Sequence, residues 1–459
     1  MTWSEPSQLH RTAKLLIDLG AASSPAEART ILEGLVLQVD VGPELGSDSG
    51  CEAALITIVN AGHRALLGGV EVRIESDTKL TVGWCKGLRV SEAIRIYGGR
   101  VVTGHSADHP TLVVGEPRRE STGSVVLHVV ASGWSGGVVE TPNPENMQKG
   151  ISLAGVMAGA LGVSEIFQYC LGSPVAGRRD VGVSLWRPDL HWQDLNGVGP
   201  TLRWLPRSLW LLGLGHLGQA YAWSLGWLPY KTPSDVNVFL MDTDSIIDGN
   251  VATGLLTRSF DLGIQKTRVV ARELESLGFR STIVERWFDD SFRLFPAEPK
   301  ICVAGFDDPA PRRLLGGDRF SGVIDGGLGA GIVGYLDILL HTFPSPLQPE
   351  MAFGSAVRST STSLPLAYEA EIQRRISGGD DEGDARCGML EFAGVTIGAA
   401  FVGAVAGALA ISDILRRLHQ GQEFSVLGLD LRSPNDSQAA FNTAPGLYVP
   451  PHADADESY

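Results

Sequence analysis

The sequence has few cysteines, and no two of them have the spacing of a metal site. Five cysteines are scattered over 459 residues, and no C-x-x-C pair occurs among Cys51, Cys85, Cys170, Cys302 and Cys387. An odd, dispersed set argues against a disulfide framework and against structural zinc. We therefore expect no zinc and a reducing, cytoplasmic compartment.

The chain also lacks an excess of positive charge. Its formal net charge is −15, which disfavours a broad surface for nucleic acid or anionic membranes. The start, MTWSEPSQLHRTAKLL, lacks the basic and then apolar run of a signal peptide. Residues 392–411 carry no charge and have the length of a transmembrane helix, but Gly and Ala dominate them and acidic residues flank them. We expect a buried helix there, with neither nucleic acid nor membrane as a partner.

Glycine is abundant, with 56 residues, and part of it lies in a repeated segment. Residues 153–167 (LAGVMAGALGVSEIF) and 401–415 (FVGAVAGALAISDIL) share seven identities in fifteen ungapped positions, and Glu165 aligns with Asp413. The alternative is that two unrelated buried helices converged on Gly and Ala packing. The matched polar positions favour a duplicated layered domain in which this helix closes each half.

Strand and helix patterns alternate most clearly in the second half of the chain. Apolar runs such as SLWLLGLG, NVFLMDTD and KICVAGFDD alternate with amphipathic segments, which predicts a mostly parallel sheet covered on both faces. The first half contains shorter β-rich runs. We predict an α/β protein with domains at 1–195 and 196–459, a linker near 173–207 and a disordered tail at 450–459.

A glycine motif marks a candidate nucleotide site. GLGHLG places Gly213, Gly215 and Gly218 directly after an apolar strand and before a helix, where backbone N–H groups and the helix N-terminus favour phosphate. The next strand ends at Asp242, whose carboxylate can accept from a ribose hydroxyl. These features alone are equally typical of a nicotinamide-dependent oxidoreductase.

The residues from Asp242 onward indicate which class of nucleotide-binding enzyme the sequence resembles. DTDSIIDGNVATGLLTRSFDLGIQK resembles the D-x-D…N…D-[IL]-G-x-x-K signature of the ubiquitin-activating E1 and ThiF–MoeB adenylation superfamily. The spacing aligns without gaps through Asp242, Asp244, Asn250, Asp261 and Lys266. DDPAPR resembles the later D-N-x-x-x-R segment and places Asp307 and Arg312, and VIDGGLGAG resembles the strand and turn after it.

The resemblance implies two ThiF/E1-like Rossmann-type adenylation folds in tandem, the N-terminal one degenerate because it lacks the glycine and D-x-D…K motifs. It also implies ATP and Mg²⁺ as cofactors, without the zinc-binding C-x-x-C pairs of many relatives. Activating a carboxylate with ATP brings anions together, so cationic groups must offset their charge. By resemblance, Asp242 and Asp244 belong to the nucleotide site, where Asp242 holds the ribose. Asn250 and Lys266 contact phosphates and Asp307 holds magnesium.

The chain departs from the superfamily pattern where an arginine is expected. Thr253 and Gly254 stand at the usual Arg-Gln position, and Asp308 replaces the Asn after the magnesium Asp. Arg258 lies nearby and is our candidate substitute. With Lys266 it completes the cationic part of the predicted catalytic set.

Cys387, in DARCGMLEFAG, is the predicted nucleophile. Arg386 and a following helix N-terminus lower a thiol pKa, and the pattern resembles E1-like proteins of bacterial ubiquitin-like conjugation operons, including the antiviral Bil type. We expect a ubiquitin-like protein and an E2-like protein as partners, and either a pseudo-dimeric monomer or a homodimer. Cys85 is the reserve nucleophile. An adenylate-only enzyme for sulfur-carrier or peptide maturation and a non-catalytic nucleotide sensor remain alternatives.

Overall fold

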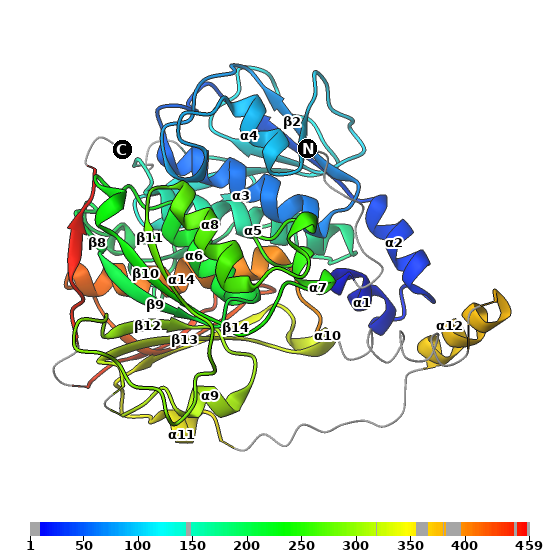
Figure 1. The fold of residues 1–459 in the computed structure, drawn as a ribbon. Coiled ribbons are helices and arrows are strands. Elements are labelled where there is room, and N and C mark those ends of the chain that lie inside the picture. The colour runs from blue at the N-terminus through cyan, green and yellow to red at the C-terminus, as the bar shows by residue number, and fades with distance from the viewer. Residues whose placement is uncertain are drawn as a thin grey trace.

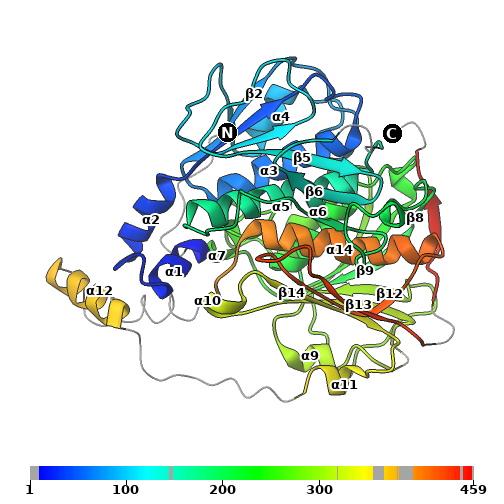
Figure 2. The same cartoon turned by 180° about the vertical axis from the view of Figure 1, so that it is seen from behind.

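Long helices fill the space between two β-sheets, and short helices cover the far side of the second sheet (Figures 1 and 2). The computed structural model describes residues 10–143, 148–317, 319–354, 366–379, 381, 396–444 and 448–456. In both views α3 (Ser49–Ala65) and α5 (Ser152–Cys170) of the first half and α6 (His216–Gly226) and α14 (Ala400–Leu418) of the second half lie between the sheets (Figures 1 and 2). The mixed α/β architecture with two sheets in tandem confirms the predicted fold class.

The first sheet has, within the described residues, the strand order β3-β2-β1-β4-β5-β6-β7. Its first five strands run parallel, and β6 and β7 are antiparallel additions. The strands are β1 (Val36–Val41), β2 (Gly69–Ile74), β3 (Gly99–Val101), β4 (Thr111–Val114), β5 (Val126–Ser132), β6 (Ser135–Val139) and β7 (Val181–Ser184).

The second sheet repeats this topology in the order β11-β10-β9-β12-β13-β14-β15-β16. Five parallel strands again precede antiparallel ones, so β9 corresponds to β1 and β12 to β4. The strands are β9 (Ser208–Leu212), β10 (Asn237–Met241), β11 (Arg280–Val284), β12 (Ile301–Ala304), β13 (Gly322–Leu328), β14 (Asp337–Phe343), β15 (Phe424–Asp430) and β16 (Gln438–Phe441).

The two copies of the repeated helix occupy the same topological position. They are α5 between β6 and β7, and α14 between β14 and β15, which supports duplication. The prediction that each helix closes its half is wrong, because a strand of the same sheet follows each.

The helices are α1 (Arg11–Asp18), α2 (Pro25–Glu33), α3 (Ser49–Ala65), α4 (Val90–Ile96), α5 (Ser152–Cys170), α6 (His216–Gly226), α7 (Asp248–Val251), α8 (Lys266–Ser276), α9 (Pro309–Arg313), α10 (Gly331–Gly334), α11 (Pro349–Ala352), α12 (Leu366–Ser377) and α14 (Ala400–Leu418). Short 3₁₀ turns are η1 (Gly83–Cys85), η3 (Leu195–Gly197), η4 (Pro233–Asp235) and η5 (Ser259–Asp261).

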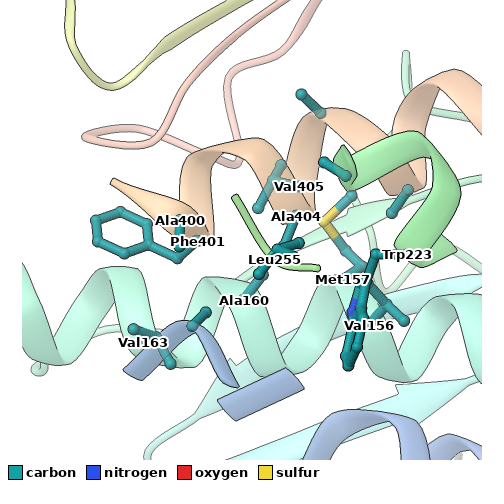
Figure 3. Packing of buried hydrophobic residues seen from close by; sticks show 14 of the residues in the cluster. Val156, Met157, Ala160, Val163, Trp223, Leu255, Ala400, Phe401, Ala404 and Val405 are labelled. Atoms are coloured by element: carbon teal, nitrogen blue, oxygen red, sulfur yellow. The ribbon is translucent and has the colours of Figure 1, made fainter. Parts of the chain in front are cut away.

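Glycine and alanine recur in these helices because backbones meet there at close range. A side chain at Gly159 of α5 would meet the carbonyl oxygen of Ala54 in α3, 2.6 Å from its Cβ. A side chain at Gly407 of α14, the aligned position, would overlap the carbonyl oxygen of Ala220 in α6. Apolar side chains fill the rest of the interface between the halves (Figure 3). They include Val156, Met157, Ala160 and Val163 of α5, Trp223 of α6, Leu255, and Ala400, Phe401, Ala404 and Val405 of α14.

Two predictions from composition are wrong. The tail is ordered through residue 456, where β17 (His452–Asp454) pairs with β8 (Trp204–Pro206). The expected linker at 173–207 contributes β7 to the first sheet. The domain boundary between 195 and 196 stays a prediction. It falls in η3, after the last strand of the first sheet.

One helix of the described residues, α5, is long and apolar enough to cross a membrane by length and composition. Its most apolar window is 89% buried inside the protein, as expected of a core helix.

Candidate functional site

The glycine loop lies at the carboxyl edge of the second sheet, between β9 and α6. Gly213 has φ +76°, a left-handed conformation that favours glycine. Gly218 lets α6 approach the loop, because a Cβ there would overlap the carbonyl of Gly213. Gly215 differs from both, because a Cβ built on it meets no atom within 4 Å. The N-terminus of α6 is therefore open beside Gly215, and a phosphate group fits that place.

Asp242 follows β10 and lies against this loop. Its carboxylate accepts hydrogen bonds from the backbone N–H of Leu214 at 2.6 Å and of Asp244 at 2.8 Å. Burial raises the pKa of Asp242, and the positive charge of Lys266 and the two backbone bonds act in the opposite direction. The carboxylate is thus fixed beside the glycine loop, where a ribose hydroxyl would meet it.

Lys266 begins α8 and is already paired. Its Nζ lies 2.7 Å from Oδ2 of Asp244, and its backbone N–H donates to the carbonyl of Asp244 at 2.9 Å. The side chain of Lys266 is 11% exposed and that of Asp244 is 59% exposed, so the carboxylate can turn away when another anion arrives. The side-chain oxygen of Asn250 accepts from the backbone N–H of Ile247 at 2.9 Å and orients its amide group at α7.

The predicted substitute arginine is engaged elsewhere. Arg258 contacts Oε2 of Glu273 in α8 at 3.3 Å and lies over the ring of Phe260, 5.8 Å from its centre. Its backbone N–H donates to Asp261 at 2.8 Å. These partners place the guanidinium against α8, and no described contact joins it to the glycine loop.

Arg11, which sequence reasoning missed, reaches the site from the first half of the chain. It is the first residue of α1 and is half-buried. Its Nε is buried without a hydrogen-bond partner among the described residues, and a Cβ built on Gly249 of α7 would lie 3.2 Å from it. Burial lowers the pKa of Arg11, and the carboxylate of Asp307 opposes that effect. A half-buried guanidinium with a buried, unused donor therefore lies near the carboxylate of Asp307.

Asp307 and Asp308 follow β12, and their carboxylates have different surroundings. Asp308 caps α9 by accepting from the backbone N–H of Ala310 at 2.8 Å, while Asp307 is exposed. The described part of the chain contains no cluster of three or more His, Cys, Asp or Glu side chains suited to a metal. A lone carboxylate still fits magnesium, which commonly binds one or two carboxylates together with phosphates and water.

Arg312 has a structural partner. It donates from Nε to both carboxylate oxygens of the buried Asp325 in β13, at 3.1 and 3.2 Å, and its guanidinium lies 4.2 Å from the ring centre of Phe353. Burial raises the pKa of Asp325 to about 6, against the opposing effect of Arg312. The pair holds α9 against the sheet, so Arg312 has a structural role.

In the first sheet, the carboxylate of Glu44 lies at the edge that corresponds to the glycine loop of the second sheet. Gly42 after β1 and Gly115 after β4 match Gly213 and Gly305 in strand order, and a Cβ on either would overlap Oε2 of Glu44. Glu44 also accepts from the backbone N–H of Glu116 at 3.0 Å. A glutamate carboxylate therefore occupies the position in the first half that corresponds to the glycine loop of the second half.

Cys387 lies outside the described residues, so its role stays a prediction. Burial raises the thiol pKa of each of the other four cysteines, to about 11 at Cys170. Cys85 is fully buried, and a buried thiol with a raised pKa is a poor nucleophile. The reserve prediction for Cys85 is therefore not supported.

Comparison with known proteins places both halves of the chain in one family. The BilD N-terminal domain matches residues 36–185, and the BilD C-terminal domain matches residues 205–421. A bacterial E1-like protein BilD from Collimonas sp. (strain OK412) is 35% identical over 450 residues, which span 97% of this chain and 95% of the relative.

The solved structures are more distant. E. coli MccB is 14% identical with a TM-score of 0.34, covering 71% of this chain and 95% of that one. E. coli MccB with ATP is 15% identical with a TM-score of 0.33, covering 71% and 98%. Since the Collimonas relative is matched over nearly its whole length, this chain belongs to the BilD family of bacterial E1-like proteins.

Proposed function

We propose that this protein uses ATP to activate the C-terminal carboxylate of a ubiquitin-like protein in the cytoplasm, as the E1 of a Bil-type antiviral conjugation system. Family membership supports activation chemistry of the E1 type. The observation that carries the nucleotide site is the convergence of an open glycine turn, a fixed carboxylate and a half-buried arginine at one sheet edge.

The backbone of the glycine loop and the N-terminus of α6 hold the phosphates next to Gly215. Asp242 accepts from the ribose, and Lys266 exchanges Asp244 for a phosphate oxygen. Asn250, oriented by its bond to Ile247, offers its amide to the same anion. Arg11 supplies the cationic group that the superfamily pattern has at the position of Thr253 and this chain lacks there. Asp307 holds Mg²⁺, which when bound offsets phosphate charge as a Lewis acid.

The adenylation step balances as a displacement at the α-phosphorus. An oxygen of the carrier's C-terminal carboxylate forms the new P–O bond, the bond between the α-phosphorus and its bridging oxygen breaks, and pyrophosphate leaves with the electron pair. Negative charge gathers on the departing oxygens, so cationic donors held beside them stabilise the transition state. Arg11, the first residue of α1, and Lys266, the first residue of α8, would serve as these donors.

In the second step, the Cys387 thiolate attacks the acyl carbon. The new S–C bond forms as the C–O bond to AMP breaks, which leaves a thioester that an E2-like cysteine can take over. Because the two halves share one chain and α1 of the first half supplies Arg11 to the second, a pseudo-dimeric monomer accounts for the site.

A non-reducing gel tests the proposal with purified protein, Mg-ATP and a candidate ubiquitin-like protein. We expect a thiol-sensitive adduct in the wild type and none after Cys387→Ala, with carrier-dependent ATP–pyrophosphate exchange in both. Exchange without any adduct would mean that the chemistry ends at the adenylate. If the protein binds NAD and shows no exchange with any carrier, the proposal is wrong.

Two alanine substitutions in the glycine loop separate binding from folding. Gly215→Ala fills space that the protein leaves open, so we expect near-wild-type stability but at least about tenfold weaker Mg-ATP binding, since a phosphate would meet the methyl group. Gly218→Ala overlaps the Gly213 carbonyl and should cost about 1–3 kcal/mol of unfolding free energy. Isothermal titration and urea unfolding measure both. Unchanged ATP affinity in Gly215→Ala would contradict the placement of the phosphates.

A further inference from the structure

His216, the first residue of α6, is half-buried between the glycine loop and the start of α14. Its Nε2 is buried without a partner among the described residues. A side chain at Gly403 of α14 would overlap the imidazole. The ring also hydrogen-bonds to the backbone of Ala399, the residue just before α14. One side chain therefore joins the phosphate-binding end of α6 to the start of α14.

The first half of the chain shows that the fold does not need this imidazole. Gly155 of α5 aligns with Gly403, and a side chain on Gly155 would overlap the backbone of Gly50 in α3. Gly50 thus stands where His216 stands in the second half, and the two helices meet backbone to backbone. The imidazole is an addition confined to the half that carries the glycine motif.

The imidazole also lies beside the arginine of the site. A Cβ built on Gly398 would be 3.6 Å from Nδ1 of His216 and 3.8 Å from Cδ of Arg11, with Cγ2 of Thr253 at 3.2 Å. Burial, then the nearby charge of Arg11, lower the pKa of His216 to about 3, and its bond to Ala399 opposes them. A ring that stays neutral can pack next to a guanidinium without repelling it.

We infer that His216 is a positioning residue for the adenylation site, which holds Arg11 and the start of α14 in register with the glycine loop. The inference rests on the proposed function and assigns His216 no contact with the substrate. Arg11 comes from α1 and forms no ion pair with another described residue. Asp307 acts on it only through its negative charge. The direction of the Arg11 side chain therefore depends on what packs around it, and the side chains of His216 and Thr253 lie with it around Gly398.

A double-mutant cycle tests whether His216 acts through Arg11. In ATP–pyrophosphate exchange we expect His216→Ala to lower kcat/KM about tenfold in the wild-type background, but less than about twofold when Arg11 is already alanine. His216→Asn keeps a donor for Ala399 and should recover most of the lost rate. Additive losses, with no recovery in His216→Asn, would overturn the inference by making the effect purely structural.

His63→Ala is the matched control. His63 lies in α3 of the first half, and burial lowers its pKa to about 3 as well, but it packs on Gly98, just before β3 of the first sheet. We expect a similar change in melting temperature and no change in kcat/KM. Wild-type protein that neither binds Mg-ATP in titration calorimetry nor shows exchange would overturn the proposed function together with this inference. Normal wild-type exchange, with an additive cycle and no recovery in His216→Asn, would overturn the inference alone.

Discussion

Arg11→Ala is expected to lower kcat for adenylation by a factor of about 10²–10³, the usual loss when one preorganised donor to a developing negative charge is removed. The guanidinium is partly desolvated, its Nε has no partner among the described residues, and Asp307 is the acidic group whose charge it senses. Affinity for Mg-ATP should change less, because the charge on the leaving pyrophosphate develops in the transition state. Carrier-dependent ATP–pyrophosphate exchange measures kcat, and titration calorimetry measures affinity.

Two other arginines serve as comparisons. Arg29 of α2 is paired with Glu33 at 2.7 Å on the exposed side of the neighbouring helix, so Arg29→Ala should leave exchange unchanged. Arg258→Ala should cost some stability through Glu273 but little kcat. If instead Arg258→Ala abolishes exchange while Arg11→Ala keeps it, Arg258 supplies the missing arginine, as the sequence first suggested.

The parts of the fold that sequence could predict are those with a local signature. Apolar runs bounded by turns gave the parallel strands, and glycine spacing placed the loop after β9. The ordered series from Asp242 to Lys266 lies at the same sheet edge as the glycine loop because it follows β10, the parallel neighbour of β9. The alignment of Glu165 with Asp413 correctly indicated two helices in matching places.

What sequence could not predict depends on contacts between distant segments. Nothing around Arg11 in α1 distinguishes it from other arginines until α1 packs next to α7 and Gly398. The only indication in the sequence was that Thr253 stands where the superfamily has an arginine. Arg258 was chosen as the substitute because it lies near Thr253 along the chain. The ordered tail was missed for the same reason. Its polar composition is typical of disorder, but backbone pairing with β8 holds it.

Asp413→Ala is expected to lower the free energy of unfolding by about 3–5 kcal/mol, because it breaks a buried ion pair from one side. Asp413 lies 2.8 Å from Nη2 of Arg416 and 3.3 Å from Nε of Arg417. Both guanidinium side chains are at most 1% exposed, and of the two only Arg417 has another described carboxylate partner, Glu423 at 3.0 Å. Without Asp413, Arg416 keeps its bond to the carbonyl of Leu185 but loses its counter-charge.

Glu165→Ala, the aligned change in α5, is the matched comparison. Glu165 pairs with Arg179 at 2.6 Å, but that guanidinium side chain is 22% exposed and also donates to the carbonyl of Arg432. Water can solvate Arg179 once its partner is gone, so the loss should be smaller, about 1–3 kcal/mol. Urea unfolding followed by circular dichroism compares the two variants in one background. Equal losses would mean that burial of the arginines does not decide the cost, and a larger loss for Glu165→Ala would contradict the argument outright.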